Sequence, residues 1–294
     1  MIITPRNISL CIAQINYNSG NIQAHVERIK DIISENSGCD LIIFPELMLH
    51  GHPSFEKPEG FLYRKMKVVY SSVSEDLYRF VQGQDARVII GELKRRGERY
   101  YNVATYVDRE TIQSYVKTHV HWTENFFPGR EIRAFDTPLG KIGINICYDA
   151  AFMEVWRVLA LTGALIIVNI SAVPRHFPVR YMWRRMAGAA IFNEVFVVYA
   201  NRPGELFSGH SAVFDPQGER MVSAGENETI LHASINLDKA EEWRNAEPVM
   251  EQRRPLLYRR IGLRQPAALE DYFLNSQEEW TSGRYSQAAE GGAG

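Results

Sequence analysis

The stretch that most constrains the fold runs from Gly140 to Phe152 and reads GKIGINICYDAAF. Isoleucine alternates with small or polar residues in its first half, and this period of two predicts a β-strand. The following residues, Ala151 to Gly163, are mostly apolar and predict a helix. Cys147 is therefore expected where a strand ends and a helix is about to begin.

A thiol in this position can serve as a nucleophile. N–H groups at a helix start favour thiolate over thiol, and N–H groups just after the cysteine can hold an oxyanion. A free cysteine is also often a small buried apolar residue. The residues that lie around Cys147 in the fold must decide between the two interpretations.

Strands and helices alternate along the rest of the chain, which predicts an α/β layered fold with one mixed sheet or two packed sheets. We expect a single domain over residues 1–274 and a tail, 275–294, that is flexible or crosses to another subunit. Residues 47–69 lack periodicity and predict a long loop of functional interest. The expected strands are 7–15, 39–46, 86–93, 100–108, 111–118, 140–146, 164–171, 195–202, 210–216, 218–225 and 228–237, and the expected helices lie within 18–38, 71–81, 151–163 and 179–193.

Composition argues against several classes of function. A net charge of −2 argues against nucleic acid as a partner, and no stretch approaches the roughly 20 apolar residues of a membrane span. The first residues lack the pattern of a secretory signal. The three cysteines form no CxxC pair, and together with the eight histidines they give no metal-binding motif. We therefore expect a cytoplasmic protein without a metal or another cofactor.

Three charged residues fall at strand ends or in the loops beside them. Glu46 ends LIIFPE, Lys117 ends SYVK, and Glu124 follows seven residues later. Each taken alone is most simply a surface charge. Combined with Cys147 they supply a nucleophile, a base and a cation for an oxyanion, which are the groups that acyl transfer requires.

The motifs around these residues resemble those of the carbon–nitrogen hydrolase (nitrilase-like) superfamily, over about residues 7–260. They are LIIFPELMLHGH, VKTHVHWTENFFPGRE, GINICYDAAFMEVWR, VNISAVP, GAAIFNEVFVVYANRPG and FSGHSAVFDPQGE. The resemblance implies a four-layer α–β–β–α sandwich that forms homodimers or larger homo-oligomers. It also implies that Cys147 is the nucleophile and Glu46 the general base. Lys117 and the Tyr148 N–H would stabilise the oxyanion, and Glu124 would position Lys117 or the substrate's amino group.

The residues after Cys147 bear on the substrate. True nitrilases commonly have Cys-Trp-Glu, whereas this chain has Cys147, Tyr148 and Asp149, which favours amide or ureido substrates. Relatives that hold a substrate carboxylate have arginine shortly after the cysteine, where this chain has Ala150 and Ala151. Other side chains would then have to bind the substrate, and the candidates are His52, Trp122, Tyr148, Arg175 and His176.

The sequence thus predicts an amidase or N-carbamoyl amidohydrolase that acts on a small molecule through a thioester and releases ammonia. Hydrolysis of a nitrile and acyl transfer to an amine remain open, because the same residues could perform either reaction. A scaffolding protein without activity would be expected to have lost a residue of the Glu46–Lys117–Cys147 triad, and all three are present.

Overall fold

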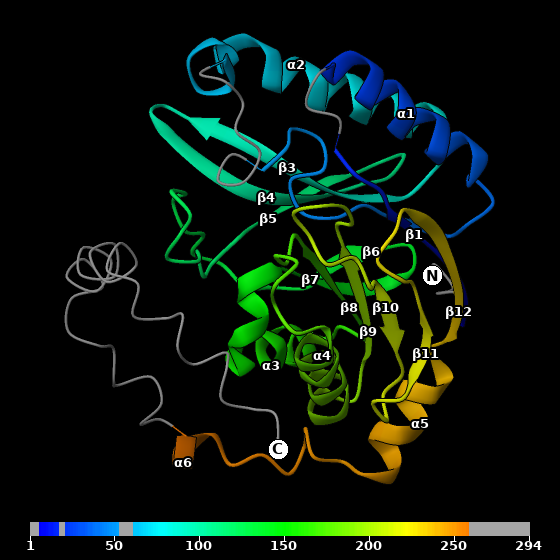
Figure 1. Cartoon of the computed structure of the whole chain (residues 1–294). Helices are drawn as coiled ribbons and strands as arrows, with labels where there is room; N and C mark the ends of the chain where they lie inside the picture. The colour runs from blue at the N-terminus through cyan, green and yellow to red at the C-terminus, as the bar shows by residue number, and fades with distance from the viewer. Residues whose placement is uncertain (1–5, 18–20, 53–60, 259–294) are drawn as a thin grey trace.

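Two six-stranded mixed sheets packed face to face form the centre of the computed structural model, which describes residues 6–17, 21–52 and 61–258 (Figure 1). The first sheet has the order β12-β1-β2-β3-β4-β5 and the second the order β11-β10-β9-β8-β7-β6. The strands of the first sheet are β1 (Asn7–Gln14), β2 (Leu41–Ile43), β3 (Val88–Arg96), β4 (Arg99–Val107), β5 (Ile112–Val116) and β12 (Thr229–Asn236). Those of the second are β6 (Phe135–Thr137), β7 (Gly140–Ile146), β8 (Ile166–Ser171), β9 (Phe196–Asn201), β10 (Ala212–Phe214) and β11 (Arg220–Ser223).

Helices cover the outer face of each sheet. Helices α1 (Ile22–Glu35) and α2 (Phe61–Gly83) lie over the first sheet, and α3 (Met153–Leu161) and α4 (Val179–Asn193) lie over the second (Figure 1). Two further helices, α5 (Asp238–Ala246) and α6 (Pro255–Tyr258), follow the last strand. The expected four-layer α–β–β–α sandwich is therefore confirmed.

The alternation of side chains along each strand produces the layers. Ile8, Leu10 and Ile12 of β1 point between the sheets and share a core with isoleucines of β7, whereas Cys11 and Ala13 point outward and pack beneath α1. Since successive residues of a strand face opposite sides, one strand supplies both cores. Strands β1 and β8 have buried residues on both faces, and apolar residues occupy most of their positions for this reason.

The region after β7 is close to its predicted form. Residues Cys147–Ala151 form a 3₁₀ turn, η1, and α3 begins at Met153, two residues after the predicted helix start at Ala151. Cys147 has a φ of +46°, which an α-helix does not accommodate.

Several other predictions need correction or fall outside the described residues. Helix α2 begins at Phe61, ten residues before the predicted start, so the predicted loop over 47–69 ends earlier; FLYRKMKVVY contains no glycine or proline that would stop it. Strand β12 pairs antiparallel with β1, which joins the end of the second half to the first sheet. The tail, 275–294, lies outside the described residues. No helix in the described part of the chain is both long and apolar enough to cross a membrane.

Candidate active site

The four predicted catalytic residues follow strands of both sheets. Glu46 lies just after β2 and Lys117 directly after β5 in the first sheet, whereas Cys147 lies directly after β7 in the second. Glu124 lies in the loop after Lys117. The side chains of Glu46 and Lys117 are fully buried.

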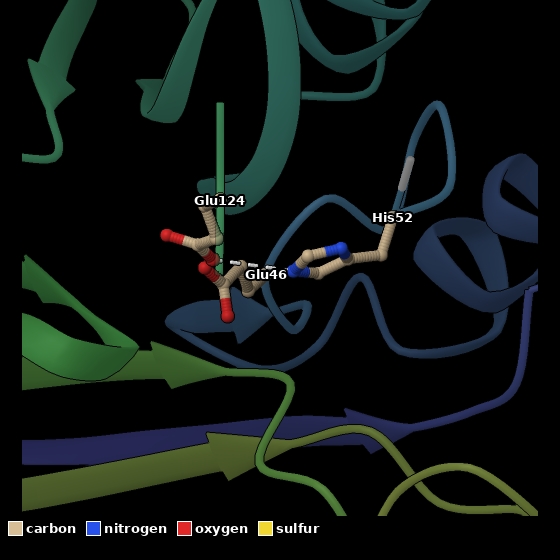
Figure 2. A group of neighbouring side chains, drawn as sticks. All are labelled: Glu46, His52 and Glu124. Carbon is tan, nitrogen blue, oxygen red and sulfur yellow. Dashed lines mark ion pairs between the residues drawn. The ribbon is translucent and has the colours of Figure 1, made fainter. Parts of the chain in front are cut away.

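Lys117 joins the two glutamates. Its Nζ lies 2.9 Å from Oε1 of Glu46 and 2.9 and 2.8 Å from the two carboxylate oxygens of Glu124. Asn102 donates a second hydrogen bond, of 2.7 Å, to the same Oε1 of Glu46. Oε2 of Glu46 is buried and has no partner among the described residues, so one oxygen of this carboxylate can still accept a proton. Figure 2 shows the two carboxylates facing each other.

The charges of this group stabilise one another. Burial alone would lower the pKa of Lys117, but the carboxylates of Glu124 and Glu46 outweigh burial and hold this pKa well above its ordinary value. Burial would raise the pKa of Glu124, but the charge of Lys117 and the hydrogen bond from His52 hold it below its ordinary value. Lys117 is therefore an ammonium and Glu124 a carboxylate at neutral pH.

Cys147 is a protonated thiol in this setting. Burial raises its pKa above the ordinary value, and the negative charge of Glu46 raises it further. Lys117 and the backbone N–H of Ala172 act in the opposite direction without reversing the shift. Groups that favour a thiolate are present at this junction, but burial and the neighbouring carboxylate outweigh them in the resting site. A thiol of this kind needs a base at the moment of attack.

Asp149 fastens the turn that carries Cys147 to the segment that carries Lys117. Its buried carboxylate accepts hydrogen bonds from the backbone N–H of Ile146 at 3.0 Å and of His119 at 2.7 Å. It also accepts bonds from the hydroxyls of Tyr115 and Thr118, each at 2.9 Å. Sequence reasoning missed this role, since Asp149 served there only to compare motifs; an acid two residues after a candidate nucleophile was the available signal.

Two glycines let the backbone around the predicted catalytic residues pack closely. A Cβ on Gly91 of β3 would lie 2.4 Å from the Pro45 oxygen and the Leu47 nitrogen, on either side of Glu46. A Cβ on Gly129 would lie 2.3 Å from the oxygen of Val116, the residue before Lys117. Only glycine fits at such approaches.

Comparison with known proteins decides the family. Residues 9–245 match the carbon-nitrogen hydrolase family. The chain belongs to this family. It is a cysteine-dependent, amidase-like enzyme.

Individual relatives agree with this membership. The hydrolase is 26% identical to omega-amidase NIT3 of Saccharomyces cerevisiae over 288 residues, which cover 86% of this chain and 95% of that protein. It is 30% identical to a nitrilase of Pyrococcus abyssi over 231 residues, covering 75% of this chain and 86% of that one. The solved structure of a mutant amidase from Nesterenkonia sp. AN1, which carries the acetamide moiety of fluoroacetamide on its active-site cysteine, has a TM-score of 0.74. Its sequence is 19% identical, and the match covers 88% of this chain and 98% of that one.

The predicted substrate-binding residues of the hydrolase fall into two groups. His52 lies beside the catalytic group, with its Nε2 3.3 Å from Oε1 of Glu124 (Figure 2). Trp122 and Tyr148 meet edge to face at 5.6 Å between ring centroids, and the ring of His121 stacks on Trp122 at 3.8 Å. Burial lowers the pKa of His121 to about 4, so its imidazole is neutral.

Arg175 and His176 form the second group. The Arg175 guanidinium lies 2.7 Å from the Glu226 carboxylate and 3.1 Å from the Gly204 oxygen, at the exposed surface. His176 is exposed as well. No described contact joins either side chain to the catalytic group, so their role in binding stays a prediction.

Three side chains of the hydrolase offer the donor atoms of a possible metal site. One ligand atom from each of Glu46, His52 and Glu124 lies within 4.8 Å of the others, a set that suits a divalent cation (Figure 2). However, the ammonium of Lys117 already bonds to both carboxylates. The side chain of Lys117 therefore supplies the positive charge that a metal would otherwise provide.

Proposed function

We propose that Cys147 hydrolyses the carbon–nitrogen bond of a small carboxamide or N-carbamoyl compound through a thioester and releases ammonia. The observation that carries the proposal is the contact of Lys117 with both Glu46 and Glu124, while Oε2 of Glu46 keeps no described partner. This arrangement offers a base for a protonated thiol and a fixed cation for an oxyanion.

In the first half of the reaction Glu46 takes the proton of the Cys147 thiol as Sγ attacks the carbonyl carbon. The C=O π electrons move to oxygen, and the Lys117 ammonium and the Tyr148 N–H stabilise the resulting oxyanion. When the oxyanion collapses, the carbon–nitrogen bond breaks and Glu46 returns its proton to the leaving nitrogen. Ammonia departs and a thioester remains on Cys147.

In the second half Glu46 takes a proton from water, and the hydroxide attacks the thioester carbon. Collapse of this second oxyanion breaks the carbon–sulfur bond, the acid leaves, and the proton on Glu46 returns to Sγ. One amide and one water have become one acid and one ammonia. Glu124 keeps its charge throughout and holds Lys117, and His52 holds Glu124 in turn.

The substrate class follows from the relatives and the pocket residues. The names omega-amidase and amidase favour a carboxamide over a nitrile. His52, Trp122 and Tyr148 would line the acyl site, with Arg175 and His176 as the outer candidates. A small acyl group that is partly apolar fits aromatic walls of this kind.

Intact-protein mass spectrometry tests the proposal. A rapidly quenched reaction of the unaltered chain with a primary amide should show an acyl group on Cys147, and in Glu46→Gln, where the base is gone, both formation and hydrolysis of this adduct should slow. Cys147→Ala should show neither the adduct nor ammonia release, whereas Cys39→Ala, which removes another partly exposed thiol, should retain both. Ammonia release by Cys147→Ala would refute the mechanism. Parallel assays with N-carbamoyl amino acids and nitriles assign the substrate class.

We further propose a single domain over residues 1–274 that forms a homodimer or larger homo-oligomer and works in the cytoplasm. Large apolar side chains exposed on α3 and α4 support association, namely Met153, Tyr181, Ile191 and Phe192, which are 48–65% exposed. All three cysteines are free thiols, which suits a reducing compartment. Sedimentation velocity measures the oligomeric state, and a purely monomeric chain would contradict it.

A further inference from the structure

A cavity of about 720 Å³ lies apart from the catalytic residues, where β3 and β4 join. Among the residues that the structure describes, its walls include five basic residues, no acidic one and none of the four predicted catalytic residues. The lining consists of Lys94, Arg95, Arg96, Arg99, Tyr101, Val103, Ser114, Val116, Phe127, Pro128, Gly129 and Arg130.

The register of the hairpin explains why Lys94, Arg96 and Arg99 share one face, whereas Arg95 points to the opposite face. Lys94 pairs with Tyr101 and Arg96 with Arg99 across β3 and β4. Side chains two residues apart face the same way, so Lys94 and Arg96 lie on the face of Glu92. Glu92 meets the Tyr78 hydroxyl of α2, which places the cavity on the outer, helix-covered face of the first sheet.

Three of the five cations are uncompensated. Lys94 lies 3.1 Å from Glu92, and Arg95 lies 2.6 Å from Glu98. Arg96, Arg99 and Arg130 form no ion pair with an acidic residue of the described chain. The protein as a whole is slightly acidic, with 33 lysine and arginine against 35 aspartate and glutamate residues, so this concentration of positive charge is local.

The guanidinium group of Arg99 is also held in one orientation. Arg99 lies over the ring of Phe127 at 4.8 Å, which fixes its plane at low entropic cost. Like charges that face one cavity repel each other, and an anion relieves that repulsion.

We propose that this cavity binds a small polyanion, a molecule with at least two neighbouring phosphate or carboxylate groups. Planar guanidinium groups pair with such oxygens through two parallel hydrogen bonds. The segment that forms one wall also contacts the catalytic loop, because Gly129 N–H donates to the Lys117 oxygen at 2.8 Å. The bound anion therefore stabilises the backbone that carries Lys117. This inference is independent of the reaction proposed above.

Isothermal titration calorimetry of the full chain tests the inference, with pyrophosphate and citrate as probes and acetate as the singly charged control. Pyrophosphate or citrate should bind saturably with one site per chain, and more weakly at high salt. Acetate should not bind. Whichever of pyrophosphate and citrate binds more tightly shows whether the cavity prefers phosphate or carboxylate groups.

Matched variants locate the site. Arg99→Gln and Arg130→Gln should each weaken binding about tenfold, since each removes one charge-assisted pair. Arg109→Gln, an exposed arginine at the opposite end of β4, should bind like the parent. Circular dichroism checks that all three fold. Absence of saturable binding, or an equal loss in Arg109→Gln, would overturn the inference.

Discussion

At the scale of single residues, the charges around Lys117 and Cys147 set the protonation state of each side chain. Lys117 stays charged because Glu124 and Glu46 outweigh the cost of its burial, whereas Cys147 stays protonated because burial and Glu46 outweigh Lys117. In the proposed mechanism the site therefore holds its cation ready for an oxyanion and generates the thiolate only when Glu46 accepts the proton.

The thiol of Cys147 provides a direct test of this balance. Glu46→Gln removes a negative charge that raises the pKa of Cys147, so we expect that pKa to fall. Mass-resolved alkylation of Cys147 by iodoacetamide across a range of pH measures the shift without any substrate. An unchanged or higher pKa in the variant would mean that Glu46 does not act on the thiol.

Asp149 provides a second test at this scale. Asp149→Asn removes the charge and replaces one acceptor oxygen by an amide nitrogen, so the bonds from the Ile146 and His119 N–H groups, which reach different oxygens, cannot both be kept. We expect the free energy of unfolding to fall by about 2 kcal/mol. We also expect kcat to fall more than KM rises, because the cysteine turn loses its tie to the lysine segment. A loss of stability with unchanged kcat would limit Asp149 to a structural role.

At the scale of elements, close backbone contacts place the catalytic residues. Backbone hydrogen bonds join the turn that carries Glu46 to Gly91 of β3 on both sides. The Leu49 N–H donates to the Gly91 oxygen at 2.9 Å, and the Gly91 N–H donates to the Pro45 oxygen at 3.2 Å. Cys147 sits in the turn η1, with a left-handed backbone that costs free energy and persists because the surrounding elements hold it.

Gly91→Ala tests the contact between β3 and the Glu46 turn. The added methyl group would meet backbone atoms at 2.4 Å, so Glu46 must move, and we expect kcat/KM to fall by about a hundredfold, as a displacement of about 1 Å can produce. Gly83→Ala is the control, since its added methyl meets nothing within 4 Å. Steady-state kinetics of both variants compares them, and equal activities would contradict the role given to this contact.

At the scale of the whole molecule, the stacking of two sheets assembles the site. Glu46 and Lys117 follow strands of the first sheet and Cys147 follows a strand of the second, so the proposed reaction depends on how the two sheets pack. His25 of α1, outside the two sheets, also contacts the segment after Glu46, because its Nε2 lies 2.8 Å from the Met48 oxygen.

His25 also predicts how stability depends on pH. Burial lowers its pKa to about 4, although the hydrogen bond to the Met48 oxygen acts to raise this pKa. Between about pH 6.5 and pH 4 the unfolded chain binds a proton that the folded chain does not, so the free energy of unfolding falls as pH falls. The expected loss from this residue is about 2 kcal/mol between pH 7 and pH 5. Urea unfolding at both values should show a smaller loss in His25→Gln, and an identical loss would contradict the assignment.

Local patterns in the sequence determined much of the fold. The period-two alternation before Cys147 predicted β7, and the helix predicted over 179–193 coincides with α4 (Val179–Asn193). The motifs around Glu46, Lys117, Glu124 and Cys147 identified the family, because short segments near a reacting centre have strict chemical requirements. By contrast, the start of α2 was misplaced, since an aperiodic neighbouring stretch hid its beginning.

Only the tertiary structure decided how these residues act on one another. The ion pair of Lys117 with Glu46 and the hydrogen bond from His119 to Asp149 join positions that are far apart in the chain, and the protonated state of Cys147 depends on its distant neighbour Glu46. The same holds for the basic cavity, where the register of a hairpin gathers arginines onto one face. A sequence specifies which side chain each position has, but burial and distance set its pKa and its partners, and both arise only when the two sheets pack.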